Sequence, residues 1–174
     1  MKLTNNLTIE QLLQTSWGNQ FNKNQKSAIL RSASMGLDPM IVAKPEFSNF
    51  QMLVIASAHE AGMDPLPFTK HIFEPYQCDM LLHGIYHRVN AAAYADSSFS
   101  HEQMRLSFKY LYNDKVDVVK YIREGFIEKQ LNIIAKGLKS GLDVDKFAKL
   151  EYSSVEMLHE CNKLERLKRL KHAS

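Results

Sequence analysis

The chain has 174 residues, of which 45% are hydrophobic and 24% are charged. This composition is typical of one folded globular domain and argues against a disordered chain. The net charge is only +3, and the basic excess lies in residues 160–174, so the body of the chain lacks the strongly basic surface of a nucleic-acid-binding domain.

The opening residues contain no unbroken apolar segment of the kind found in signal peptides, and no apolar run of about 18 residues predicts a membrane span. The two cysteines, Cys78 and Cys161, lie inside apolar helical patterns. That placement is typical of reduced core thiols and not of a disulfide framework. We therefore expect a cytoplasmic protein that does not contact a membrane.

A repeating unit of about 26 residues predicts an all-α fold. Successive units begin at Gly36, Gly62, Arg88, Lys115 and Gly141, in steps of 26, 26, 27 and 26 residues. Two columns of large apolar or aromatic residues recur in register: Val42, Phe68, Tyr94, Tyr121 and Phe147, followed by Phe47, Phe73, Phe99, Phe126 and Tyr152. One unit cannot bury these residues alone, so we expect stacked copies in a solenoid-like fold.

We expect a single helical-repeat domain over residues 1–174. It consists of a partial unit at about 8–35 and units 36–61, 62–87, 88–114, 115–140 and 141–174, the last including a longer C-terminal capping helix.

Polar residues predict a helix-turn-helix structure for each unit. An aspartate followed by proline, as at Asp38 and Asp64, is typical of the N-cap of a short helix. Capping boxes after the second aromatic column predict the start of a longer helix, and glycine at the start of the next unit predicts its end. The boxes pair Ser48 with Gln51, Ser100 with Gln103, and Ser153 with Glu156.

The unit at 141–157, G-L-D-V-x-x-F-A-x-x-x-Y-x-x-x-E-M, resembles short helical repeats found in uncharacterised proteins of Firmicutes, their phages and mobile elements. The resemblance covers residues 21 to about 160. It implies a helical-repeat architecture and brings no catalytic residues with it. Small helical folds in phages include inhibitors of host defence, anti-CRISPR proteins among them, and this analogy favours an inhibitor of a host nucleoprotein.

Catalytic and cofactor motifs are absent from the sequence. It contains no nucleophile elbow, glycine-rich phosphate loop or H-E-x-x-H motif, so we expect no enzyme and no cofactor. His83 and His87 have the i, i+4 spacing of a helical zinc site, with Asp79 on the same face. No further ligands converge on them, and solvated histidines are the favoured interpretation.

The middle units depart most from the repeat and predict a surface that binds a protein partner. Arg88 and Lys115 stand where the other units have glycine, and tyrosines alternate with basic residues nearby. Aromatic residues and arginine are enriched at protein interfaces. The expected partner-binding residues are Tyr86, His87, Arg88, Arg105, Lys109 and Tyr112.

The basic C-terminal helix gives an alternative function, that of a nucleic-acid-associated regulator. Lys163, Arg166, Arg169 and Lys171 are the residues expected to contact a polyanion. The solvated face of a capping helix explains the same charges and is the favoured interpretation. The identity of the partner and the oligomeric state stay open at this point.

Overall fold

A computed structural model describes residues 7–173 of the chain. In that range the chain forms α-helices, short 3-10 turns and a π turn, without a strand. The prediction of an all-α fold is therefore confirmed. None of the helices in this range combines the length and the apolar content needed to cross a membrane.

The chain divides into two compact units, one ending at Ser98 and the other beginning at Phe99. The predicted single domain of stacked repeats stays a prediction.

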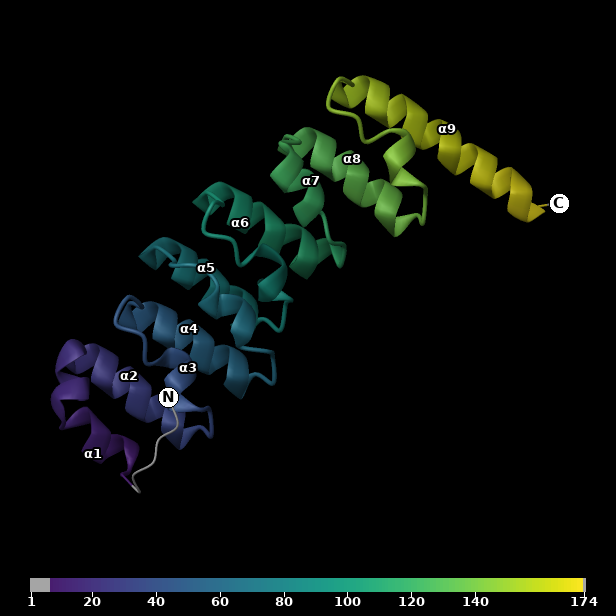
Figure 1. Cartoon of the computed structure of the whole chain (residues 1–174). Helices are drawn as coiled ribbons and strands as arrows, with labels where there is room; N and C mark the ends of the chain where they lie inside the picture. Colours follow the sequence, from purple (N-terminus) through teal and green to yellow (C-terminus); the bar gives the residue numbers. More distant parts are fainter. Residues whose placement is uncertain (1–6, 174) are drawn as a thin grey trace. The chain divides into compact units, whose positions relative to one another are not determined.

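In the first unit, three helices of 12 residues lie side by side: α2 (Lys23–Ser34), α4 (Asn49–Glu60) and α5 (Pro75–Tyr86) (Figure 1). Shorter elements connect them or precede them. These are α1 (Ile9–Leu13), η1 (Ser16–Gln20), α3 (Pro39–Val42), η2 (Leu66–Thr69) and η3 (Ala91–Tyr94). Because α4 packs against both α2 and α5, its side chains Met52, Val54 and Ile55 are completely buried.

In the second unit, α6 (His101–Lys109) continues into the π turn η4 (Tyr110–Asp114). It is followed by α7 (Val119–Glu124), α8 (Glu128–Lys139), η5 (Val144–Lys146) and α9 (Ser154–Ala173). α8 packs against α9, and Leu131, Ile134, Met157 and Cys161 are buried.

The predicted columns of large residues form the core. All five members of the first column are buried, and so are four members of the second. The exception is Tyr152, which is half-buried. Cys78 and Cys161 are both free and buried, as the apolar pattern predicts.

The glutamines of the capping boxes have a second role that the sequence did not reveal. Gln51 Nε2 donates to the carbonyl oxygens of Phe68 at 3.0 Å and His71 at 2.6 Å, and its Oε1 accepts from the Phe73 N–H at 3.2 Å. Gln25, Gln77 and Gln130 likewise donate to carbonyls 20 to 22 residues further along the chain. The side-chain oxygens of Gln25, Gln77 and Gln130 also accept from the N–H at their own helix start. The predicted capping box of Ser48 and Gln51 is only half formed: Ser48 Oγ accepts from the Gln51 N–H, but the Gln51 side chain bonds to the following turn instead.

The first residue of each predicted unit, which follows a long helix, has a left-handed backbone conformation. Gly36, Gly62 and Gly141 have φ between +60° and +78°, and the two residues that replace glycine, Arg88 and Lys115, both have φ of +58°. L-residues other than glycine avoid this region, at a cost of about 1–2 kcal/mol. The five predicted unit starts thus share one backbone conformation, whereas the bounds of the units stay a prediction.

The 27-residue step of the repeat corresponds to the π turn. In this unit the helix cap Ser100 lies 15 residues before the left-handed residue Lys115. In the other units the spacing between the helix cap and the next left-handed residue is 14 residues: 22 to 36, 48 to 62, 74 to 88 and 127 to 141. A one-residue insertion into a helix is accommodated as a π bulge. The extra residue therefore widens the end of the helix and leaves both flanking caps in place.

Candidate functional site

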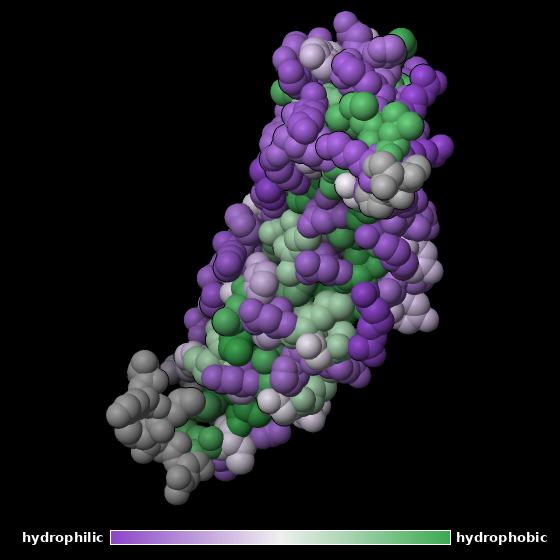
Figure 2. Space-filling view, turned by 90° about the vertical axis from the view of Figure 1, so that its right-hand side faces the viewer, coloured by the Kyte–Doolittle hydropathy of each residue, from purple (hydrophilic) through white to green (hydrophobic). Residues whose placement is uncertain are grey.

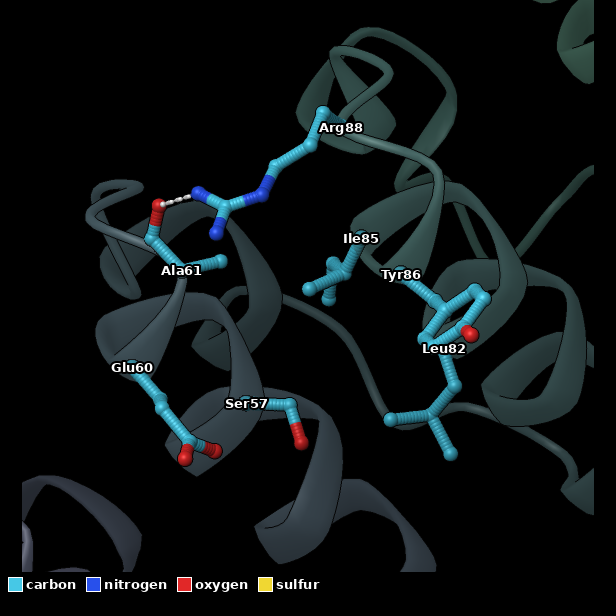
Figure 3. A pocket seen from close by; sticks show the side chains of 7 residues that line it. All are labelled: Ser57, Glu60, Ala61, Leu82, Ile85, Tyr86 and Arg88. Carbon is cyan, nitrogen blue, oxygen red and sulfur yellow. Dashed lines mark hydrogen bonds between the residues drawn. The ribbon is translucent and has the colours of Figure 1, made fainter.

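A groove of about 460 Å³ lies between α4 and α5, at the C-terminal ends of both helices. α4 contributes Ser57, Glu60 and the adjoining Ala61, and α5 contributes Leu82, Ile85 and Tyr86, with Arg88 at one end (Figure 3). The α5 wall is apolar and the α4 wall is polar. Three predicted anchors, Tyr86, His87 and Arg88, are consecutive residues at this site, and two of them line the groove.

Tyr86 is the most exposed of the large hydrophobic side chains in residues 7–173, at 82%. It is the last residue of α5, and its ring meets the half-buried ring of His87 edge-on at a centroid distance of 5.2 Å. Folding alone gives no reason for an aromatic residue at so exposed a position, because it buries little apolar surface there.

Arg88 crosses from the end of α5 to the end of α4. Its Nη1 donates a 2.8 Å hydrogen bond to the carbonyl oxygen of Ala61, the C-cap of α4 (Figure 3). This is the one hydrogen bond that the Arg88 side chain makes within the described part of the chain, so the remaining guanidinium N–H groups are available at the mouth of the groove.

Glu60 is the last residue of α4 and is exposed. A carboxylate at this end of a helix is opposed by the helix dipole, at a cost of about 0.3–1 kcal/mol. Within residues 7–173 no ion pair compensates it. Glu60 and Arg88 thus both occupy positions that folding disfavours, and such positions are typical of functional sites.

Arg105 and Lys109, two further predicted anchors, lie on α6 in the second compact unit and bind acids there. The Arg105 guanidinium donates two 2.7 Å hydrogen bonds to Glu102, and these hold the pKa of the Glu102 carboxyl below its ordinary value. Lys109 Nζ lies 2.6 Å from Glu128 on α8. Ion pairs within the protein therefore account for both residues.

Tyr112, the remaining predicted anchor, belongs to the π turn and is 38% exposed. Its ring stacks on Phe108 at a centroid distance of 5.2 Å, and Lys115 Nζ lies over it at 4.9 Å. Beside it, burial and the carboxylates of Glu128 and Asp114 raise the pKa of Tyr110 to about 12. Tyr110 donates to Asn132 Oδ1 at 2.8 Å, so the turn is tied to α8.

The basic residues of α9 are only partly paired. Lys163 contacts Glu160 at 3.3 Å and Arg169 contacts Glu165 at 3.3 Å. Arg166 has no ion pair with any residue in the described range. A shallow hollow of about 400 Å³ on this helix is lined by His159, Asn162, Lys163, Arg166 and Leu167, and it includes no carboxylate. Lys171 lies further along the same helix and is exposed.

The histidine pair does not form a metal centre by itself. The rings of His83 and His87 meet at a centroid distance of 4.5 Å. In the part of the chain that the structure describes, no three His, Cys, Asp or Glu residues converge on a point where they could hold a metal ion.

Apolar patches set among hydrophilic side chains occur on the face shown in Figure 2. Exposed large apolar residues are found in both compact units, among them Phe50, Ile72 and Tyr86 in the first and Val155 and Leu170 in the second. Of these, Tyr86 borders the α4–α5 groove, which is also lined by the acidic Glu60 and the basic Arg88.

Comparison of the chain with protein-family models, curated proteins and solved structures found no match.

Sequence reasoning found the α5 side of the groove and missed the α4 side. Ser57, Glu60 and Ala61 belong to a unit that follows the repeat closely. They were not predicted as partner-binding residues, because that prediction rested on departures from the repeat. The signal present in the sequence was Glu60, an acid two residues before the helix-ending Gly62, where a basic residue is favoured.

Proposed function

We propose that this chain is a non-enzymatic, protein-binding helical-repeat module, built of stacked helix-turn-helix units, that binds its partner in the groove between α4 and α5. The observation that carries the proposal is Tyr86, an 82% exposed aromatic residue at the edge of that groove. Exposed aromatic and arginine side chains at an apolar groove are the usual anchors of protein interfaces.

The residues of the second unit have a lesser part in this proposal. Arg105 and Lys109 already bind Glu102 and Glu128, so a partner would have to replace those contacts. Neither Tyr112 nor the basic residues of α9 line the α4–α5 groove. An inhibitor of a host-defence nucleoprotein, the form that the resemblance favours, would act by covering a surface that its target needs.

A capture experiment from a cell lysate tests the proposal. The double variant Tyr86→Ala, Arg88→Gly should lose the partner, because truncation of anchor residues costs about 2 kcal/mol or more, roughly 30-fold in affinity. The matched control is Tyr76→Ala, which removes an exposed tyrosine from the first turn of α5 and should retain the partner. Equal retention by the double variant and the control would contradict the proposal.

Polyanion binding by α9 is the second candidate function, and the carboxylate-free hollow around Arg166 favours it. If it is correct, the chain binds mixed DNA or RNA with an affinity that falls steeply with salt, and Lys163→Gln with Arg166→Gln removes that binding. Lys168 should be kept in this test, because its Nζ donates to the carbonyls of Ser140 and Gly141 and supports the end of α8.

A further inference from the structure

From the charges around the α4–α5 groove, we infer that its occupant is a protein segment that places a large apolar side chain between one carboxylate and one basic group. The inference rests on the proposed protein-binding function and adds the chemistry of the partner.

The apolar part of the occupant follows from the α5 wall. Leu82, Ile85 and Tyr86 form one side of the groove (Figure 3). Ile85 is buried and Leu82 is half-buried, so this wall forms a shallow apolar binding surface. A surface of this size can bind one branched or aromatic side chain, with polar contacts around it.

The carboxylate of the occupant follows from Arg88. One guanidinium nitrogen, Nη1, is held by the Ala61 carbonyl at 2.8 Å, which fixes the orientation of the planar group. Its other N–H donors are not used by any residue in the range 7–173. A guanidinium held in this way is preorganised to bind a carboxylate, and the fixed side chain loses little entropy on binding.

The basic group of the occupant follows from Glu60. This carboxylate lines the same groove from α4 and lies at the C-terminal end of that helix, where the partial negative charge of the helix dipole repels it. A cation from a partner would satisfy both the carboxylate and the partial negative charge of the helix end. Glu60 and Arg88 therefore set the direction in which the segment binds, with its acid toward Arg88.

Selection from a random peptide display library on the full chain tests this inference, with Tyr86→Ala as the counter-selection target. Peptides that require Tyr86 should carry a large apolar residue with an acidic residue on one side and a basic residue on the other. Selection on Glu60→Lys should exchange the basic residue for an acidic one. Synthetic copies of the original peptides should bind Glu60→Lys, and separately Arg88→Gly, about 10-fold more weakly or worse than the parent chain.

The variant Arg88→Gly removes the charge and the hydrogen bond to Ala61, but glycine relieves the left-handed backbone at this position, so we expect the variant to stay folded. Peptides that require Tyr86 but show no charge preference would overturn the inference and leave the protein-binding groove standing. Failure to select any peptide that requires Tyr86 would overturn both the inference and the proposed function.

Discussion

Arg88 Nη1 donates a 2.8 Å hydrogen bond to the carbonyl oxygen of Ala61, so a residue that lies just beyond the end of α5 also caps α4. The backbone of Arg88 is at the same time left-handed, with φ of +58°. The side chain thus stabilises a helix end while the backbone conformation opposes folding. Alanine and glycine at position 88 should therefore differ in their effect on stability, because both remove the side-chain bond but only glycine relieves the backbone.

Arg88→Ala should destabilise the protein by about 1 kcal/mol, because it removes the hydrogen bond to Ala61. The β-carbon stays in the left-handed region, so the backbone strain is the same as in the parent chain. Arg88→Gly removes the same bond but relieves the backbone, so the glycine variant should be more stable than the alanine variant by about 1 kcal/mol. Urea denaturation of the two variants measures the difference. Greater stability of the alanine variant would show that residue 88 is not left-handed.

Gln51→Ala should be much more damaging than Gln103→Ala, although both glutamines occupy the same position in the repeat. Gln51 is fully buried and bonds to three backbone groups of the following turn. Its loss leaves buried polar groups without partners, at a cost on the order of 3 kcal/mol or more. The side chain of Gln103 bonds only to the backbone N–H of Ser100 in the described part of the chain, so its loss should cost about 1 kcal/mol or less. Chemical denaturation that ranks them in the opposite order would refute the second role of the glutamines.

Gly84→Ala should also destabilise the protein, because an added β-carbon would lie 1.9 Å from the hydroxyl oxygen of the buried Tyr94. Overpacking of this kind costs about 1–3 kcal/mol. Tyr94→Phe removes the obstructing oxygen and leaves the ring, so Gly84→Ala should cost less in the Tyr94→Phe background. A double-mutant cycle measures this coupling. Strict additivity of the two substitutions would contradict the packing of Gly84 against Tyr94.

The sequence was sufficient to predict elements that depend on local chemistry. Helix starts follow from Ser48 and Ser100, and the left-handed helix ends follow from the column that contains Gly62 and Arg88. These features depend on residues within a few positions of each other, so a repeat displays them directly.

Features that depend on contacts across the repeat were not predicted. The bond from Gln51 to His71 joins residues 20 positions apart, and the close approach of Gly84 to Tyr94 depends on how a turn packs on a helix. The groove is of the same kind, since Glu60 and Arg88 come together only when α4 and α5 pack. Only the irregular half of the groove differed enough from the repeat to be noticed in the sequence.

The pH dependence of stability should reflect Cys78. Burial raises the pKa of its thiol to about 11, from an ordinary value near 9. The unfolded thiol therefore loses its proton first as the pH rises. Because the folded state then binds more protons, the free energy of unfolding should fall between pH 9 and pH 11, by an amount on the order of 1 kcal/mol. Cys78→Ala should show a shallower decline over this range in urea denaturation, and an unchanged slope would mean that the thiol is not shielded from water.

Site-specific photocross-linking tests the central claim, that the α4–α5 groove is a protein-binding site, most directly. A photoreactive phenylalanine analogue is placed at Tyr86 in one sample and at Tyr76, the exposed tyrosine at the opposite end of α5, in the other. Irradiation in cells should give a discrete cross-linked protein from position 86 that survives nuclease treatment, and little product from position 76. Equal products from the two positions, or a product at 86 that nuclease removes, would contradict the claim.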